Sequence, residues 1–125
     1  MLNPDEVFAI IVGRTLRRAR LKIELDQDFL AERLSLSQPG VSKIERLGRC
    51  GLPMFHKYCT AVETTPKEVI DTAEALYEAL MKDAEDGKLA RTTKEVALWS
   101  DDVFAEWVKE DEGIAEAEEM EVNDD

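Results

Sequence analysis

The stretch RLSLSQPGVSKIERLGR, residues 33–49, gathers side chains suited to recognising a polyanion. Gln38 carries an amide that both donates and accepts hydrogen bonds, and Lys43, Arg46 and Arg49 follow it as cations. A glutamine and a lysine on one short helix can reach base edges in a DNA groove, while arginines can reach phosphates. The stretch therefore indicates recognition of DNA.

Cys50, His56 and Cys59 are the other residues whose types could do chemistry. Zinc sites usually take four ligands, and these three residues, which include the only histidine, leave the set one short. Cys59 instead shares a helical stripe with Phe55 and Tyr58, which is typical of a core face. No nucleophile–base group, carboxylate constellation or phosphate-cradling glycine loop stands out. We therefore expect no metal, no cofactor and no enzymatic activity.

The charge of the chain is unevenly distributed. Its 16 basic and 28 acidic residues give a formal net charge of −12, which by itself opposes binding to DNA. Residues 1–60, however, contain ten basic and seven acidic residues, whereas residues 61–125 contain six and 21. The acidity belongs to the C-terminal half, and local potential matters more for docking than the sum over the chain.

The bulk composition bounds the class of protein. The chain has 125 residues, 44% of them hydrophobic, which is enough for the core of one domain. No apolar run approaches the ~20 residues of a membrane helix, and no secretory signal is visible. Two cysteines fit free thiols in a reducing compartment. We expect a cytoplasmic protein without a membrane segment.

Helical signals dominate the first part of the chain, and no strand-like alternation of useful length is present. Asn3, Asp26, Ser37 and Thr65 are each placed to cap a helix. In the second helix we expect Phe29, Leu30, Ala31 and Leu34 to face inward. The predicted helices cover about residues 4–22, 27–34, 38–46, 53–62, and 66 to a stop near Gly87.

The chain after residue 90 has weaker signals. Val96, Trp99, Val103 and Trp107 share one helical face, but Ser100 followed by two aspartates is typical of a helix start. We therefore predict helix with a break near Ser100. Residues 110–125 contain nine acidic and no basic residues, and this composition predicts a disordered or loosely helical tail.

Residues from about Ile11 to Ile70 resemble the Cro/cI-like (XRE-type) helix-turn-helix family, through the run LRRARLKIELDQDFLAERLSLSQPGVSKIER. The positions that match in kind and spacing are Arg20, Leu25, Gln27, Leu30, Ala31, Leu34, Ser37, Gln38, Val41, Ser42, Ile44 and Glu45. The resemblance implies an all-α fold: a five-helix Cro/cI-like (lambda-repressor-like) domain with a C-terminal helical extension. The sequence departs from the family pattern at Leu47, a position where glycine is usual, and the glycine comes one residue later, at Gly48. The expected organisation is a DNA-binding domain at 1–72, a helical extension at 73–109 and the acidic tail at 110–125.

The resemblance also implies roles for individual residues. Those expected to contact DNA bases are Gln38, Pro39 and Lys43. Those expected to contact phosphates are Gln27, Ser42 and Arg46, joined by Arg49 in the loop that follows the third helix. Arg20 and Glu45 are expected to form a structural ion pair between the first and third helices.

The function implied is sequence-specific regulation of transcription, most simply by a dimeric repressor of bacterial or phage (mobile-element) origin that reads a palindromic operator in double-stranded DNA. The residues expected to form the homodimer are Leu76, Tyr77, Leu80, Trp99, Phe104 and Trp107. In the alternative, the same segment folds back onto its own domain and extends the core. The alternative function is that of an antitoxin, which neutralises a basic protein partner through the acidic C-terminal half and represses its own operon.

Overall fold

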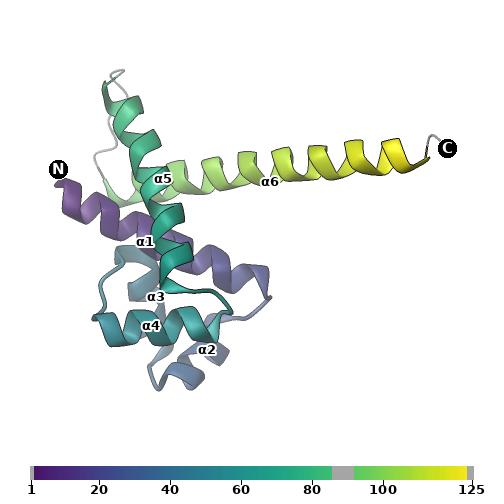
Figure 1. The fold of residues 1–125 in the computed structure, drawn as a ribbon. Helices are drawn as coiled ribbons and strands as arrows, with labels where there is room; N and C mark the ends of the chain where they lie inside the picture. The colour runs from purple at the N-terminus through teal and green to yellow at the C-terminus, as the bar shows by residue number, and fades with distance from the viewer. Residues whose placement is uncertain (1, 86–91, 124–125) are drawn as a thin grey trace.

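The computed structural model describes residues 2–85 and 92–123, which form six α-helices and no β-strand (Figure 1). In chain order the helices are α1 (Pro4–Lys22), α2 (Gln27–Leu34), α3 (Gln38–Leu47), α4 (Leu52–Ala61), α5 (Pro66–Glu85) and α6 (Thr93–Asn123). The predicted all-α class is confirmed, and each of the first five helices begins within one residue of its predicted start. The expected stop at Gly87 lies outside the described residues.

Side-chain caps explain why the starts of α1, α2, α3 and α5 were predictable. The Asn3 side chain accepts a hydrogen bond from the Glu6 backbone N–H at 2.8 Å, and its amide donates to the Glu6 carboxylate at 2.9 Å. This reciprocal pair is a variant of the capping box, in which the Asn3 side-chain amide replaces the backbone N–H as the donor to Glu6. Thr65 likewise accepts from the Glu68 backbone N–H at 3.1 Å, and a proline follows each of these caps. In each case the capping side chain and the backbone N–H that it accepts from lie only three residues apart in the chain.

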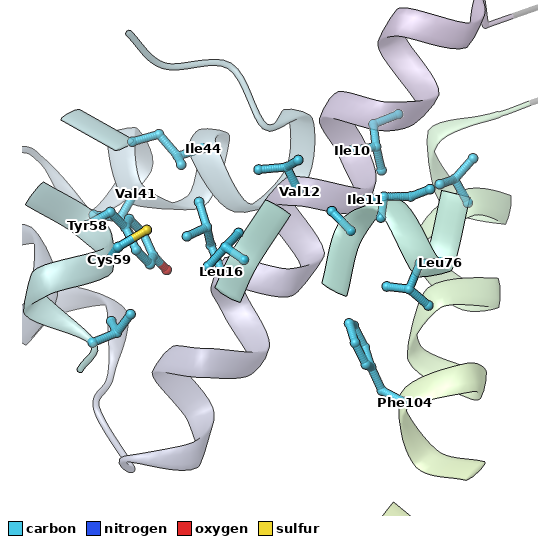
Figure 2. Packing of buried hydrophobic residues seen from close by; sticks show 14 of the residues in the cluster. Ile10, Ile11, Val12, Leu16, Val41, Ile44, Tyr58, Cys59, Leu76 and Phe104 are labelled. Carbon is cyan, nitrogen blue, oxygen red and sulfur yellow. The ribbon is translucent and has the colours of Figure 1, made fainter. Parts of the chain in front are cut away.

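Helix α1 lies at the centre of the molecule and contacts α3, α5 and α6. Figure 2 shows Val41 and Tyr58 on one side of α1, and Leu76 and Phe104 on the other. Ile11 of α1 is fully buried, as are Val41, Tyr58 and Leu76. Because α1 buries side chains in both directions, the helices before and after residue 72 share a single core.

Two glycines allow α3 to approach α1 closely. A Cβ atom on Gly13 would lie 2.6 Å from the Glu45 carbonyl oxygen, so any larger residue there would push the helices apart. Gly48 ends α3 in the left-handed conformation with φ 65°, and a Cβ atom there would overlap the carbonyl oxygen of Ala9. Gly48 thus both ends α3 and lets the end of this helix lie against α1.

The predicted break near Ser100 is wrong, because α6 continues through it without interruption. Ser100 is fully buried, and its hydroxyl donates to the Val96 carbonyl oxygen at 2.8 Å, so it is satisfied inside the helix and caps nothing. The next residue, Asp101, pairs with Arg14 of α1. Asp101 therefore links α6 to α1.

The backbone of α6 is helical as far as Asn123, where the composition predicted a disordered or loosely helical tail. In Figure 1 this end of α6 extends away from the other helices. The expected boundary between residues 72 and 73 falls inside α5. Val69 and Leu76, on either side of that boundary, are buried in the same core.

Phe29 on α2 does not face inward as predicted. Its side chain is 45% exposed, and the Arg33 guanidinium lies 4.7 Å from the centre of its ring. Leu30, Ala31 and Leu34 are buried and cover the inner face of this short helix without it.

Candidate nucleic-acid interface

A tight turn at residues 35–37 joins α2 to α3. Ser35 adopts a left-handed conformation with φ 54°, and the Leu36 N–H donates to the Ala31 carbonyl oxygen at 2.9 Å. Ser37 then accepts a hydrogen bond from the Gly40 N–H at 3.1 Å and caps α3, as predicted. Gln38 is therefore the first residue of α3, and it is exposed.

The Gln38 side chain is held by a second glutamine. Its amide nitrogen donates to the side-chain oxygen of Gln27, at the start of α2, at 2.6 Å. The amide nitrogen of Gln27 donates in turn to a carboxylate oxygen of Glu45 at 3.3 Å. An exposed side chain at the tip of α3 is thus connected to a residue in the core.

This chain of hydrogen bonds determines which way both amides face. An ionised carboxylate only accepts hydrogen bonds, so the nitrogen of Gln27 faces Glu45 and its oxygen faces Gln38. Gln38 must then present its nitrogen to Gln27. One N–H and the carbonyl oxygen of Gln38 remain available for another molecule.

A buried ion pair anchors the network. The Arg20 guanidinium donates to both carboxylate oxygens of Glu45, at 2.9 and 3.0 Å, with side chains only 7% and 2% exposed. Arg20 also donates to the Leu25 carbonyl oxygen at 2.7 Å, and the Tyr58 hydroxyl donates to Glu45 at 2.9 Å. The ion pair expected between Arg20 and Glu45 is confirmed and joins α1 to α3, and the Tyr58 hydroxyl adds α4 to the same cluster.

The surroundings of the pair shift two pKa values. Burial acts to lower the pKa of Arg20, but the hydrogen bond and negative charge of Glu45 outweigh it and raise that pKa. Burial, reinforced by the negative charge of Glu45, raises the pKa of Tyr58 well above its ordinary value. The arginine therefore stays charged and the tyrosine stays a neutral donor through the neutral range.

The remaining residues expected to contact DNA lie on α3 or just beyond it. Pro39, Lys43 and Arg46 are exposed on α3, as is Arg49 in the loop that follows, whereas Ser42 is half-buried. Within the described part of the chain, Lys43, Arg46 and Arg49 form no ion pair. Their positive charges are therefore exposed, two on α3 and one in the loop that follows it.

Sequence reasoning missed two members of the network. Tyr58 was expected only as a core residue, and its hydroxyl bond to Glu45 had no signal in the local sequence. Gln27 was expected at a phosphate, yet its side chain links Gln38 to Glu45. The signal in the sequence that could have indicated the Gln27–Gln38 contact is that a glutamine opens each of two consecutive helices, α2 and α3.

The residues expected to form a dimer are largely used within the chain. Leu76, Leu80 and Phe104 are buried in the core. Tyr77 packs edge-on against Phe8 with ring centres 5.6 Å apart, Trp107 packs in the same way against Phe104 at 5.8 Å, and the Trp99 indole donates to Asp83 at 3.2 Å. These six side chains therefore lie where the alternative to a dimer predicted, with the segment folded back onto its own domain and extending its core.

Comparison of the chain with protein-family models, with curated proteins and with solved structures found no match. Among the described residues, no group of three or more His, Cys, Asp or Glu side chains is arranged to hold a metal ion. In the same residues, no helix is both long enough and apolar enough to cross a membrane.

Proposed function

We propose that this protein binds DNA sequence-specifically and regulates transcription, most simply as a repressor acting in the cytoplasm. In this proposal α1–α5 form a Cro/cI-like domain and α3 enters the major groove. The observation that carries the proposal is the exposed Gln38 amide, held by Gln27 and, through it, by the buried Arg20–Glu45 pair. Such preorganisation serves recognition because little side-chain freedom is lost on binding.

The groups that Gln38 retains match adenine. Its free N–H suits adenine N7, and its carbonyl oxygen suits the adenine N6 amino group. Lys43 would reach a guanine edge, and Pro39 would contact a thymine methyl group. Arg46 and Arg49 would neutralise phosphates, helped by Ser42, while Gln27 would hold Gln38 in place.

The basic α3 surface also resolves the conflict with the net charge of −12. Exposed Lys43, Arg46 and Arg49 lie on or beside α3, whereas the acidic excess belongs to residues 61–125. These positive charges would attract DNA to the α3 region, whereas the acidic remainder of the protein would repel it. A palindromic operator, read by two copies, fits this arrangement.

Selection of bound duplexes from a random DNA library tests the proposal. The wild-type chain should enrich one motif, and Gln38→Ala should lose about 1–3 kcal/mol on that motif but far less on random DNA. Glu74→Ala, an exposed change on α5, is the control and should leave both affinities unchanged. Failure of the wild-type chain to enrich any sequence would contradict the proposal.

A second candidate is the antitoxin-type function, favoured by the projecting end of α6. This end extends from the body in Figure 1, and residues 110–125 contain nine acidic and no basic residues. A basic protein partner would suit this segment. Co-purification of a basic protein that is lost at high salt, and lost when residues 110–125 are deleted, would support this candidate.

A further inference from the structure

A groove of about 320 Å³ lies between α1 and α6, and one face of each helix forms a wall. The lining side chains recur on both helices at intervals of three and four residues, which keeps them on a single face. The pair formed by Arg14 and Asp101 joins the two helices at the start of this groove. Seven residues further along each helix, Leu21 and Val108 also line the groove and are 45% and 41% exposed. The groove therefore has an ion pair at one end and uncovered apolar side chains at the other.

The groove has an excess of positive charge. Among the described residues that line it, Arg14, Arg17 and Arg18 are basic and Asp101 alone is acidic, which leaves a formal charge of +2. Asp101 is already bound to Arg14. Arg17 forms no hydrogen bond, ion pair or ring contact with any part of the chain that the structure describes. An anion is therefore needed to balance this groove, although the whole chain has a net charge of −12.

Two contacts within the groove indicate which anion it suits. Arg14 donates to the two carboxylate oxygens of Asp101 through Nε and Nη2, so a carboxylate already binds a guanidinium here in the two-pronged mode. The Arg18 guanidinium lies 4.5 Å from the centre of the Phe104 ring. An arginine held against an aromatic ring loses little side-chain freedom when it meets a ligand.

The ligand class follows from cations and apolar side chains in the same groove. A nucleic-acid phosphate would use the arginines but would leave Leu21 and Val108 in water. The volume of about 320 Å³ is that of a small-molecule site. We propose that the groove binds a small organic carboxylate with an apolar body, whose carboxylate meets Arg17 and Arg18 and whose body covers Leu21 and Val108.

This site goes beyond the proposed function and does not depend on it. None of the residues assigned to DNA contact lines the groove between α1 and α6. A carboxylate can therefore bind whether or not α3 reads a DNA sequence, and the two activities can be measured separately.

The test is a titration of the isotopically labelled full chain with octanoate, followed by NMR of the backbone amides. Octanoate should bind with a dissociation constant of about 1 mM or lower. The largest shift changes should fall within residues 14–21 and 101–108. Two further probes separate the parts of the ligand, because acetate lacks the apolar body and 1-octanol lacks the charge. Each should bind at least about tenfold more weakly than octanoate.

Variants test the two walls of the groove. Arg17→Met removes a positive charge but keeps an unbranched side chain, and it should weaken octanoate binding about tenfold. Arg33→Met is the matched control, since it removes the same charge from an exposed position on α2. Val108→Glu places a negative charge in the groove and should weaken binding by at least as much. Leu98→Glu, at a position 54% exposed on the same helix, should leave the dissociation constant unchanged. The amide spectrum of each variant checks that it is folded.

Four results would overturn the inference. The first is the absence of saturable shift changes at about 10 mM octanoate, and the second is 1-octanol that binds as tightly as octanoate. The third is an equal loss of binding in Arg17→Met and Arg33→Met. The fourth is a set of shift changes centred on the apolar groove between α4 and α5, which Leu52 and Ile70 line, because the ligand would then bind by apolar contact elsewhere. None of these results bears on DNA recognition, which the selection from a random library tests.

Discussion

The side-chain nitrogen of Gln38 lies 2.6 Å from the side-chain oxygen of Gln27, and this contact joins the first residue of α3 to the first residue of α2. The partner of Gln27 is Glu45, which is itself paired with Arg20 in the core. A surface amide is therefore oriented by an ion pair that the solvent scarcely reaches. The consequences of this relationship can be measured separately from one another.

Gln27 and Gln38 should be coupled in DNA binding. If Gln27 orients Gln38, Gln27→Ala and Gln38→Ala should each weaken binding to the selected site, and the double variant should be less damaged than their sum by at least about 0.5 kcal/mol. Binding isotherms for the four proteins give this coupling energy. Additive losses would show that Gln27 contacts DNA independently, as a phosphate ligand does.

Breaking the buried ion pair should destabilise the fold even without DNA. Arg20→Met leaves the Glu45 carboxylate buried and unpaired, and it should cost about 3–5 kcal/mol in the free energy of unfolding. Urea denaturation measures this loss. Lys67→Met breaks the exposed pair with Asp71 and should cost nothing measurable. Equal behaviour of the two variants would make the Arg20 pair a surface feature.

Tyr58 should make the chain sensitive to alkali. Its pKa is raised in the folded state, so above the ordinary tyrosine value of 10.0 the unfolded chain loses a proton that the folded chain keeps. The free energy of unfolding should therefore fall as pH rises past that value, by up to about 1.4 kcal/mol per pH unit from this group. Below pH 10.0, the stabilising contribution of Tyr58 to the free energy of unfolding is fully present.

Denaturation at several pH values between about 8 and 11 tests this, by comparison of wild type with Tyr58→Phe. The phenylalanine variant should be less stable near neutrality, because it loses the bond to Glu45, but its stability should fall less steeply as the pH rises. Tyr77→Phe should keep the wild-type slope. A slope unchanged in Tyr58→Phe would assign the alkaline loss to other groups, among them Cys59, whose pKa burial raises to about 11.

Gly48 should tolerate no side chain. Its φ of 65° disfavours other residues, and a Cβ atom would overlap the Ala9 carbonyl oxygen, so Gly48→Ala should cost at least about 2 kcal/mol. Gly51→Ala is the control, because a Cβ atom there meets nothing nearer than 3.7 Å. Gly51→Ala should lower the free energy of unfolding by about 1 kcal/mol or less, as expected for a change at the start of a helix. Thermal denaturation of both variants ranks them.

The acidic C-terminal segment should weaken DNA binding by repulsion. Deletion of residues 110–125 removes nine negative charges and should tighten binding, most on random DNA and most at low salt, since charges are screened beyond ~8 Å at physiological ionic strength. Salt titrations of both proteins on selected and random duplexes measure this. A full-length control with amides in place of the nine acids separates charge from length. Superimposable curves would leave the segment without influence on DNA binding.

The sequence by itself determined where α1, α2, α3 and α5 begin, because each of these helices has a side-chain cap. Asn3 with Glu6, and Thr65 with Glu68, interact within one helical turn, so the signal and the structure it produces lie side by side in the chain. The same is true of Ser37, whose cap places Gln38 at the start of α3. Local hydrogen bonds need no information about the rest of the fold.

Only the tertiary structure decided which of the later residues face the core. Ser100 and the two aspartates after it are typical of a helix start, but Ser100 is fully buried within α6, and Asp101 pairs with Arg14, 87 residues away in the chain. Leu76 and Phe104 are equally compatible with a partner or with their own core, and α1 covers them. Tyr58 was recognisable as buried, yet its bond to Glu45 depends on how α3 and α4 meet. These outcomes depend on contacts between distant segments, and hydrophobic periodicity along one helix does not say which surface will cover its apolar face.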